Sequence, residues 1–187
     1  HVEITTLRRD VTSDGRHAKI AFTDQWLEDA KRRDFTINAL YADPYSLKIY
    51  DYFEGLSDLS SGIVRFIGDP LTRIGEDHLR ILRFFRFLAR FGKLKGEGAI
   101  ELKGEESIEL KGEGAIDGAS LKACIERRND LMALSRERIA KELFGILAVA
   151  NPLFVIELMA QHKIFEAFMP EIYHNRDMTA IIPPLSA

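Results

Sequence analysis

The chain has 187 residues, of which 46% are hydrophobic and 29% are charged, a composition typical of a globular protein with one domain or two small ones. Its one cysteine, Cys124, excludes an internal disulfide and a zinc site built from cysteines. No apolar stretch is long enough for a bilayer, and the net charge of −3 excludes a uniformly basic surface for nucleic acid.

The N-terminal residues predict a β-hairpin followed by a helix. Residues 2–7 and 17–22 are short β-type runs with a long polar connection between them. A helix is predicted over 24–42, because Asp24 is a suitable N-cap and apolar residues recur at helical spacing. The opening residues have no apolar core of a signal peptide, which together with the lone cysteine favours a cytoplasmic protein with no membrane partner.

Two more strand-like runs come next, LKIYDYF and IVRFIG, on either side of the turn-rich GLSDLSSG. A helix that carries four arginines then begins near Asp69–Pro70 or a few residues later. From residue 120 onward the pattern is helical throughout. The predicted elements are strands and helices in the first half and only helices afterwards. This order indicates the α+β class with a helical second half.

Residues 94–101, 102–109 and 110–117 form an eight-residue tandem repeat, LKGEGAIE, LKGEESIE and LKGEGAID. The period is too short for a helical solenoid, and glycine in each copy weakens a continuous helix. We therefore expect a flexible or partly helical solvated insertion over 93–117. The alternative is an interaction protein in which the repeat is the working part.

The arginines of GEDHLRILRFFRFLARFG lie three or four residues apart, which places them on one side of a helix: Arg80, Arg83, Arg86 and Arg90. Four like charges repel one another unless an anion lies alongside. Asp77 and Arg80 together offer an acceptor and a fork of donors that could meet the edge of a base. A solvated stripe with an ordinary intrahelical ion pair explains the same spacing.

The stretch RRDFTINALYAD, residues 32–43, brings three polar groups together. Asp34 and Asn38 lie four positions apart and so share a helical face, with Arg33 beside them. A carboxylate, an amide and a guanidinium can hold a ribose hydroxyl and a phosphate. A charged helix start is the simpler alternative.

Metal-ligand patterns are weak in this sequence. Glu3 lies in a strand-like run, where a carboxylate is a candidate ligand but more often faces solvent. The five histidines show no metal-ligand spacing, and there is neither a P-loop nor a nucleophile elbow.

Three long motifs occur in order: RRDFTINALYAD, DYFEGLSDLSSGIVRFIGDP and RIGEDHLRILRFFRF. Together they resemble the class II tRNA nucleotidyltransferase and bacterial poly(A) polymerase family. The resemblance covers residues 1–92 and resumes at DGASLKACIERRNDLMALSRERIAKEL. The stretch EDHLRILRFFRF is more similar to CCA-adding enzymes, because poly(A) polymerases tend to have a proline after the Glu-Asp pair.

The resemblance implies roles for individual residues. Asp77 and Arg80 match the pair that templates the base of CTP or ATP. The residues that match contacts to ribose and phosphates are Arg33, Asp34 and Asn38. The arginines that match positions beside the nucleotide are Arg83 and Arg86. Under this reading, the nucleotide supplies the anion for the arginine stripe. The segment 55–59 matches a turn that flexes when specificity switches from C to A, and Glu3 is a candidate third carboxylate near the metals.

The resemblance also implies what lies outside this sequence. Family members bind two Mg²⁺ ions through an Asp-x-Asp pair on an earlier strand, and this sequence has no Asp-x-Asp. We therefore expect an internal fragment that is catalytically incomplete alone and needs a separate chain for the catalytic carboxylates. An inactive nucleotide-binding remnant is the alternative. The expected partners are CTP or ATP and the tRNA 3′ end.

The predicted architecture is therefore α+β, an incomplete nucleotidyltransferase head followed by an all-helical neck. The predicted division is a head over 1–68, a neck over 69–92 and 118–170, the repeat insertion over 93–117, and a tail over 171–187.

Overall fold

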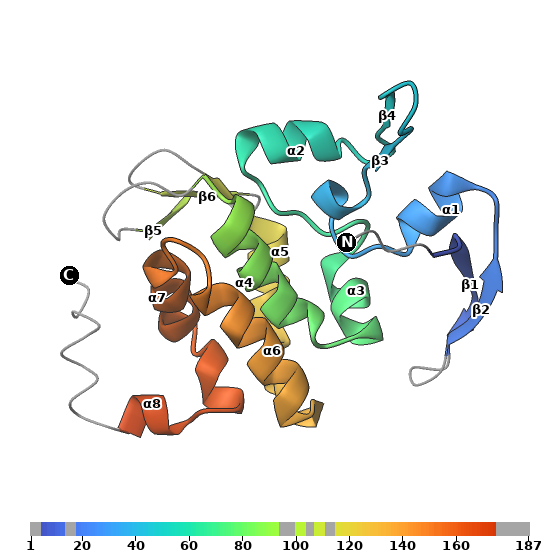
Figure 1. Cartoon of the computed structure of the whole chain (residues 1–187). Coiled ribbons are helices and arrows are strands. Elements are labelled where there is room, and N and C mark those ends of the chain that lie inside the picture. The colour runs from blue at the N-terminus through green and yellow to red at the C-terminus, as the bar shows by residue number, and fades with distance from the viewer. Residues whose placement is uncertain (1–4, 14–17, 94–99, 104–106, 111–114, 175–187) are drawn as a thin grey trace.

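The computed structural model describes residues 5–13, 18–93, 100–103, 107–110 and 115–174. Short strands and helices precede residue 70, and helices dominate after it, so the predicted α+β class with a helical second half is confirmed. In Figure 1 the helical part surrounds α4, and the first elements lie to its right and above it. No helix of the described part has both the length and the apolar character to cross a membrane.

The first two strands form an antiparallel hairpin, β1 (Arg8–Ser13) with β2 (Ala18–Phe22). The register changes between Asp10 and Thr12, which is a β-bulge. The second strand lies within the predicted 17–22. The first begins after the predicted 2–7, of which residues 5–7 are not a strand and residues 2–4 lie outside the described part.

The predicted helix over 24–42 is wrong beyond its first turns, because the structure has only α1 (Trp26–Lys31) and the 3-10 helix η1 (Thr36–Asn38). Between them Phe35 is extended and pairs with Phe66 in an isolated β-bridge. Phe35 is fully buried, and its ring lies 4.8 Å from that of Phe66. Burial of this aromatic pair outweighs the helical propensity of the segment.

A second small hairpin joins β3 (Tyr41–Ala42) to β4 (Ile49–Tyr50). The stretch predicted as a turn is a helix, α2 (Gly55–Ser61), and it ends at Gly62 with φ +72°. A glycine in this left-handed conformation is a common end of a helix, so this stretch forms a helix with a glycine at its end and does not form the predicted turn. IVRFIG forms no strand beyond the single bridge at Phe66.

The arginine-rich stretch is two helices, α3 (Pro70–Glu76) and α4 (Arg80–Phe91). Asp69 caps α3 by accepting a hydrogen bond from the Thr72 N–H at 2.7 Å, so the predicted start is confirmed. The chain is extended at Asp77, with φ −154° and ψ 109°. This break turns the chain between the two helices, and the arginine pattern did not reveal it.

The repeat forms a three-stranded antiparallel sheet in the described part, and the expectation of a flexible or helical insertion did not include these strands. The strands are β5 (Ile100–Lys103), β6 (Ser107–Leu110) and β7 (Ala115–Asp117). Equivalent residues of two copies, Ile108 and Ile116, face each other across β6 and β7. Successive described strands therefore begin seven or eight residues apart, close to the period of the repeat.

The end of the repeat, just before the predicted boundary after residue 117, packs with the helical part of the chain. The side chain of Ile116 is 1% exposed and belongs to the main core. Asp117 caps the next helix by accepting a hydrogen bond from the Ser120 N–H at 2.9 Å. The last two residues of the repeat are therefore part of the helical neck.

The neck packs against the apolar side of α4. Its remaining elements are α5 (Gly118–Glu126), η2 (Arg128–Ala133), α6 (Arg136–Leu147), α7 (Leu153–Gln161), η3 (Ile164–Ala167) and α8 (Glu171–His174). Fully buried residues on α4 include Ile81, Phe84 and Leu88, which lie three or four positions apart. This one buried stripe holds α4 in place and leaves its arginines on the other faces.

Candidate functional site

Asp34 is the buried centre of the polar cluster between the first part of the chain and α4. Its side chain is 6% exposed and lies 2.6 Å from Nε of Arg83. It also accepts hydrogen bonds from Asn38 Nδ2 at 2.9 Å and from the Phe35 N–H at 3.0 Å. Burial alone would raise the pKa of Asp34, but the Arg83 charge and these hydrogen bonds outweigh it and hold the pKa below its ordinary value.

Asp34 and Asn38 therefore meet as predicted, although the predicted helix is absent. Arg33 lies beside them in sequence but points to another partner. Its Nη2 donates to Asp29 Oδ2 at 3.0 Å, and Asp29 also accepts from Tyr41 Oη at 2.7 Å and from Arg32. The Asp29 side chain is 1% exposed.

The contacts around Asp29 shift two pKa values. Burial works against the ionised carboxylate, but hydrogen bonds from the Arg8 N–H, Tyr41 and the two arginines hold the pKa of Asp29 well below its usual range. Burial and the hydrogen bond to Asp29 raise the pKa of Tyr41 to about 12. Asp29 is therefore an ionised hub that orients Arg33 at neutral pH.

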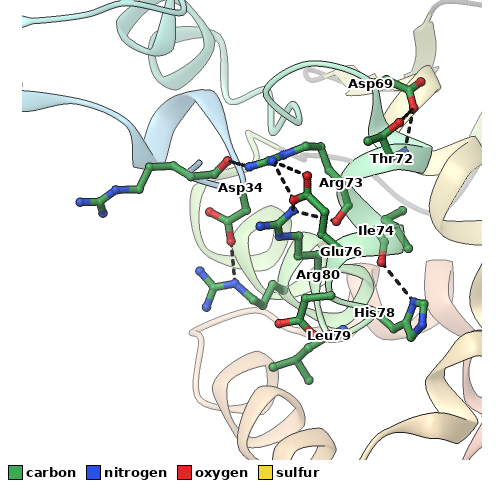
Figure 2. A network of polar contacts seen from close by, with 12 residues as sticks. Asp34, Asp69, Thr72, Arg73, Ile74, Glu76, His78, Leu79 and Arg80 are labelled. Atoms are coloured by element: carbon green, nitrogen blue, oxygen red, sulfur yellow. Dashed lines mark hydrogen bonds and ion pairs between the residues drawn. The ribbon is translucent and has the colours of Figure 1, made fainter. Parts of the chain in front are cut away.

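Arg73 joins the two predicted motifs, and the sequence analysis did not single it out. Figure 2 shows its guanidinium hydrogen-bonded to Glu76. Its Nη2 donates to the backbone carbonyl of Arg33, and its Nη1 donates to Glu76 Oε1 and Oε2 at 2.9 and 2.7 Å. Burial and the charge of Arg80 lower the pKa of Arg73. Its Nε is buried without a hydrogen-bond partner among the described residues.

Arg80 is held from two sides. Its Nη1 donates to the Arg73 carbonyl at 2.7 Å and forms an ion pair with Glu76 Oε2 (Figure 2). The side chain is 15% exposed, so its direction is largely fixed by packing. Nε and Nη2 of Arg80 have no hydrogen-bond partner among the described residues and remain available as donors.

Asp77 does not pair with Arg80, although the two lie three positions apart. Its carboxylate accepts from Arg138 Nη2 with both oxygens, at 3.0 and 2.9 Å, and from the Leu79 N–H at 3.1 Å. Arg138 lies in the first turn of α6, 61 positions later in the chain. The base-templating role of Asp77 and Arg80 remains a prediction, but each of the two is fixed by a separate partner.

The prediction that the arginine stripe lacks an anion within the chain is wrong for three of its four members. Arg80 pairs with Glu76, Arg83 with Asp34, and Arg86 with Glu142. The helix break and the folding of distant segments onto α4 bring these carboxylates alongside. Within the described part, the fourth arginine, Arg90, makes only a contact with the Phe91 ring, 5.5 Å from its centroid.

Arg86 lies apart from the Asp34 cluster and faces α6. Its Nε lies 2.5 Å from Oε2 of Glu142, whose side chain is 6% exposed. The aliphatic part of Arg86 passes so close to Gly145 that a Cβ there would overlap it. These contacts fit a residue that joins α4 to α6, and the predicted nucleotide contact of Arg86 remains a prediction.

The segment 55–59, predicted to flex, lies in α2 and is anchored at both ends. Asp51 accepts hydrogen bonds from the Gly55 and Leu56 N–H groups, both at 2.9 Å. Asp58 is buried and accepts from Thr36 Oγ1 at 2.6 Å. Its flexing remains a prediction.

The family resemblance implies Mg²⁺, and the described residues do not fit it. No group of three or more His, Cys, Asp or Glu in the described part could hold a metal ion. Each acidic residue of the cluster, Asp34, Glu76 and Asp77, is engaged by an arginine. Glu3, the candidate third carboxylate, lies outside the described residues.

An open cavity of about 700 Å³ lies between the C-terminal ends of α4 and α6 and the start of α7. Arg86, Arg90 and Phe154 are among its lining residues. It does not include Asp34, Asp77 or Arg80. The polar cluster is therefore separate from this cavity of the neck.

Sequence reasoning missed four residues that organise the cluster: Asp29, Arg73, Glu76 and Arg138. Local spacing held a signal for two of them, because Arg73 and Arg80 lie three and four positions from Glu76. Arg138 is distant in sequence, and no local pattern connects it to Asp77.

Two family models match the chain. The Poly A polymerase head domain matches residues 1–65, and the model described as the probable RNA- and SrmB-binding site of polymerase A matches residues 115–175. A human relative, CCA tRNA nucleotidyltransferase 1, mitochondrial, is 43% identical over 145 residues, which cover 78% of this chain and 29% of the relative. Poly(A) polymerase I of Haemophilus influenzae is 56% identical over 63 residues, which cover 34% of this chain and 14% of that protein.

The solved structures agree with these matches. The CCA-adding enzyme of Bacillus stearothermophilus, in complex with CTP, has a TM-score of 0.63 and 27% identity. The match covers 84% of this chain and 32% of that one, so the chain spans about a third of such enzymes. Two family models match the chain, and its fold is shared with solved members of the same family. Together with the relatives, these matches show that the chain belongs to the family of CCA-adding tRNA nucleotidyltransferases and bacterial poly(A) polymerases.

Proposed function

We propose that this chain supplies the nucleotide-recognition part of an enzyme that adds CTP- and ATP-derived nucleotides to the 3′ end of tRNA. One observation carries the proposal: Asp77 and Arg80, at the break between α3 and α4, are each fixed by other residues and still offer an acceptor and free donors. Cytosine and adenine both present an amino donor and a ring-nitrogen acceptor on the pairing edge. An aspartate and an arginine together can satisfy both groups.

The buried Asp34–Arg83 pair supports the same proposal for the rest of the nucleotide. Nε of Arg83 is engaged by Asp34, while its two terminal nitrogens have no hydrogen-bond partner among the described residues. Free guanidinium donors next to a fixed carboxylate and the Asn38 amide suit a phosphate and a ribose hydroxyl. Arg33, oriented by Asp29, is the second candidate for a phosphate contact.

Nucleotide binding is tested by titrating the full chain with CTP, ATP, UTP and GTP in a calorimeter. We expect CTP and ATP to bind more tightly than UTP and GTP. Arg80→Ala should lower the affinity for CTP by roughly tenfold or more, since it removes a charged donor to the base. Arg136→Ala, an exposed arginine of α6, is the matched control. Equal CTP affinity of wild type and Arg80→Ala would remove the base-templating role.

Catalysis is the second part of the proposal. We propose that the carboxylates for the two Mg²⁺ ions come from a separate chain or from a part of the protein outside these 187 residues, since the sequence contains no Asp-x-Asp pair. The test is a mixture of the chain, tRNA lacking CCA, CTP, ATP and Mg²⁺, with and without the product of a neighbouring gene. Incorporation by the chain alone would contradict the need for another segment.

Poly(A) addition is a second candidate, because one matching model is that of the poly(A) polymerase head and the match to poly(A) polymerase I reaches 56% identity. The two activities differ in their use of CTP. An assembled enzyme that incorporates AMP repeatedly and ignores CTP would favour poly(A) addition. An assembly that binds nucleotides without incorporating any would leave an inactive nucleotide-binding protein.

A further inference from the structure

Arg138 is the one described residue outside the α3–α4 junction whose side chain contacts Asp77. Its Nη2 lies between the two carboxylate oxygens, at 3.0 and 2.9 Å. Arg138 is itself positioned by the start of α6, where its N–H donates to the N-cap Ser135 Oγ at 3.4 Å. A rigid helix start therefore sets the direction in which the Asp77 carboxylate points.

The hydrogen bonds to Asp77 leave a defined acceptor site. An ionised carboxylate has about four acceptor positions. Oδ1 accepts from Arg138 and from the Leu79 N–H, whereas Oδ2 accepts from Arg138 alone. Among the described contacts, the position that remains lies on Oδ2. The carboxylate is thus held as an acceptor with one oxygen ready for an incoming donor.

The Arg138–Asp77 pair is too exposed to be a major source of stability. The two side chains are 48% and 38% exposed, and ion pairs of this kind contribute little to folding because water competes for them. By contrast, a charged donor on a carboxylate strongly favours its ionised form and one orientation. The contact is better suited to presenting Asp77 than to holding the neck together.

We propose that Arg138 is a positioning residue for base selection: it fixes Asp77 as an acceptor, so that the site favours bases that offer an amino group. This inference rests on the proposed function. Cytosine and adenine present an amino donor at N4 and N6, whereas uracil and guanine present carbonyl oxygens at the corresponding positions. A carboxylate held as an acceptor binds the first pair and repels the second.

The test measures selectivity in addition to affinity. The full chain, Arg138→Ala and Arg138→Lys are titrated with CTP, ATP, UTP and GTP, and the CTP-to-UTP and ATP-to-GTP affinity ratios are compared. We expect Arg138→Ala to lower both ratios by about tenfold. Arg138→Lys, which keeps a charged donor, should restore part of the loss. Arg136→Ala, from the same helical turn, should keep the wild-type ratios, and urea unfolding of each variant checks that the fold is intact.

The outcomes separate the two proposals. If the wild-type chain discriminates and Arg138→Ala discriminates equally well, the positioning role is wrong and the proposed function stands. If Arg138→Ala binds every nucleotide more tightly with unchanged ratios, Arg138 blocks the site, which also contradicts the inference. If the wild-type chain binds no nucleotide, both proposals are wrong.

Discussion

Arg83, in the first turn of α4, lies 2.6 Å from the carboxylate of Asp34, 49 positions earlier in the chain. The contact joins the two motifs that the sequence analysis singled out separately. It also ties the small first part of the chain to the neck, because Asp34 lies in the first part and Arg83 lies on α4. A nucleotide bound at this cluster would therefore contact both parts.

Loss of this ion pair should destabilise the fold strongly. Arg83→Ala leaves a buried carboxylate without its charge partner, which costs about 3–5 kcal/mol of unfolding free energy. The double variant Arg83→Ala/Asp34→Asn should recover part of that loss, since no uncompensated charge remains. Urea unfolding measures both. The control is Arg90→Ala, which should change stability by less than about 0.5 kcal/mol; a similar loss in the two single variants would contradict this account.

The free energy of unfolding should decrease at acidic pH, because two buried aspartates then become protonated. The pKa values of Asp29 and Asp34 are lower in the folded chain than their ordinary values. Their contribution is therefore fully present above about pH 4, the ordinary aspartate range, and is lost as the pH falls through the folded pKa values. Urea midpoints at pH 7, 5, 4 and 3 would show the loss below about pH 4.

The carboxylates responsible can be identified with one variant and one control. Asp34→Asn should lower stability at pH 7 and flatten the acid-dependent loss, because one of the two groups no longer titrates. Asp24→Asn changes an exposed aspartate with no ion pair in the described part and should follow the wild-type curve. Parallel curves for wild type and Asp34→Asn would assign the acid sensitivity to other groups.

Helix starts that depend on local chemistry could be predicted from the sequence. Asp69 before Pro70 and Ser135 before α6 are N-caps in the structure, and both satisfy backbone N–H groups within three residues. The prediction of a helix over 24–42 was wrong for the opposite reason. Its local pattern is helical, but Phe35 pairs with Phe66 on a later segment, which only the folded chain brings near.

The contacts of the candidate site also divide into those that local spacing predicts and those that only the folded chain brings together. The Asp34–Asn38 contact follows from a spacing of four residues and could be predicted, even though the backbone there is not an α-helix. The partners of Arg83 and Arg86 could not, because Asp34 and Glu142 come from segments far from α4 in sequence. Charge repulsion correctly indicated that carboxylates or another anion must lie nearby, but gave no means of choosing between them.

Arg86 distinguishes a structural arginine from a nucleotide-binding one. Its partner Glu142 is buried, so Arg86→Ala should cost about 3 kcal/mol or more of unfolding free energy. The affinity for CTP should change by less than about twofold under conditions where the variant is folded. Calorimetric titration at low temperature provides the comparison with Arg80→Ala. A large loss of CTP affinity with intact stability would restore the nucleotide role.

The end of the repeat should matter for stability and the rest of it should matter less. Ile116 is 1% exposed within the core, so Ile116→Ala should cost about 2–5 kcal/mol. Leu147→Ala, at a site 56% exposed, should cost less than about 1 kcal/mol. Replacing residues 94–114 with a short Gly-Ser linker should preserve cooperative unfolding, whereas a deletion of 94–117 also removes Ile116 and the Asp117 cap and should not.

Two glycines in helices should respond in opposite directions to alanine. A Cβ on Gly55 would overlap the backbone carbonyl of Thr36, which cannot move without disturbing η1. Gly55→Ala should therefore destabilise the chain by about 1–3 kcal/mol. A Cβ on Gly75, in α3, would meet nothing within 4 Å, so Gly75→Ala should stabilise the chain by about 0.4–1 kcal/mol by restricting the unfolded state. Thermal and urea unfolding of the two variants make the comparison, and equal effects would show that α2 does not pack against η1 as closely as the structure has it.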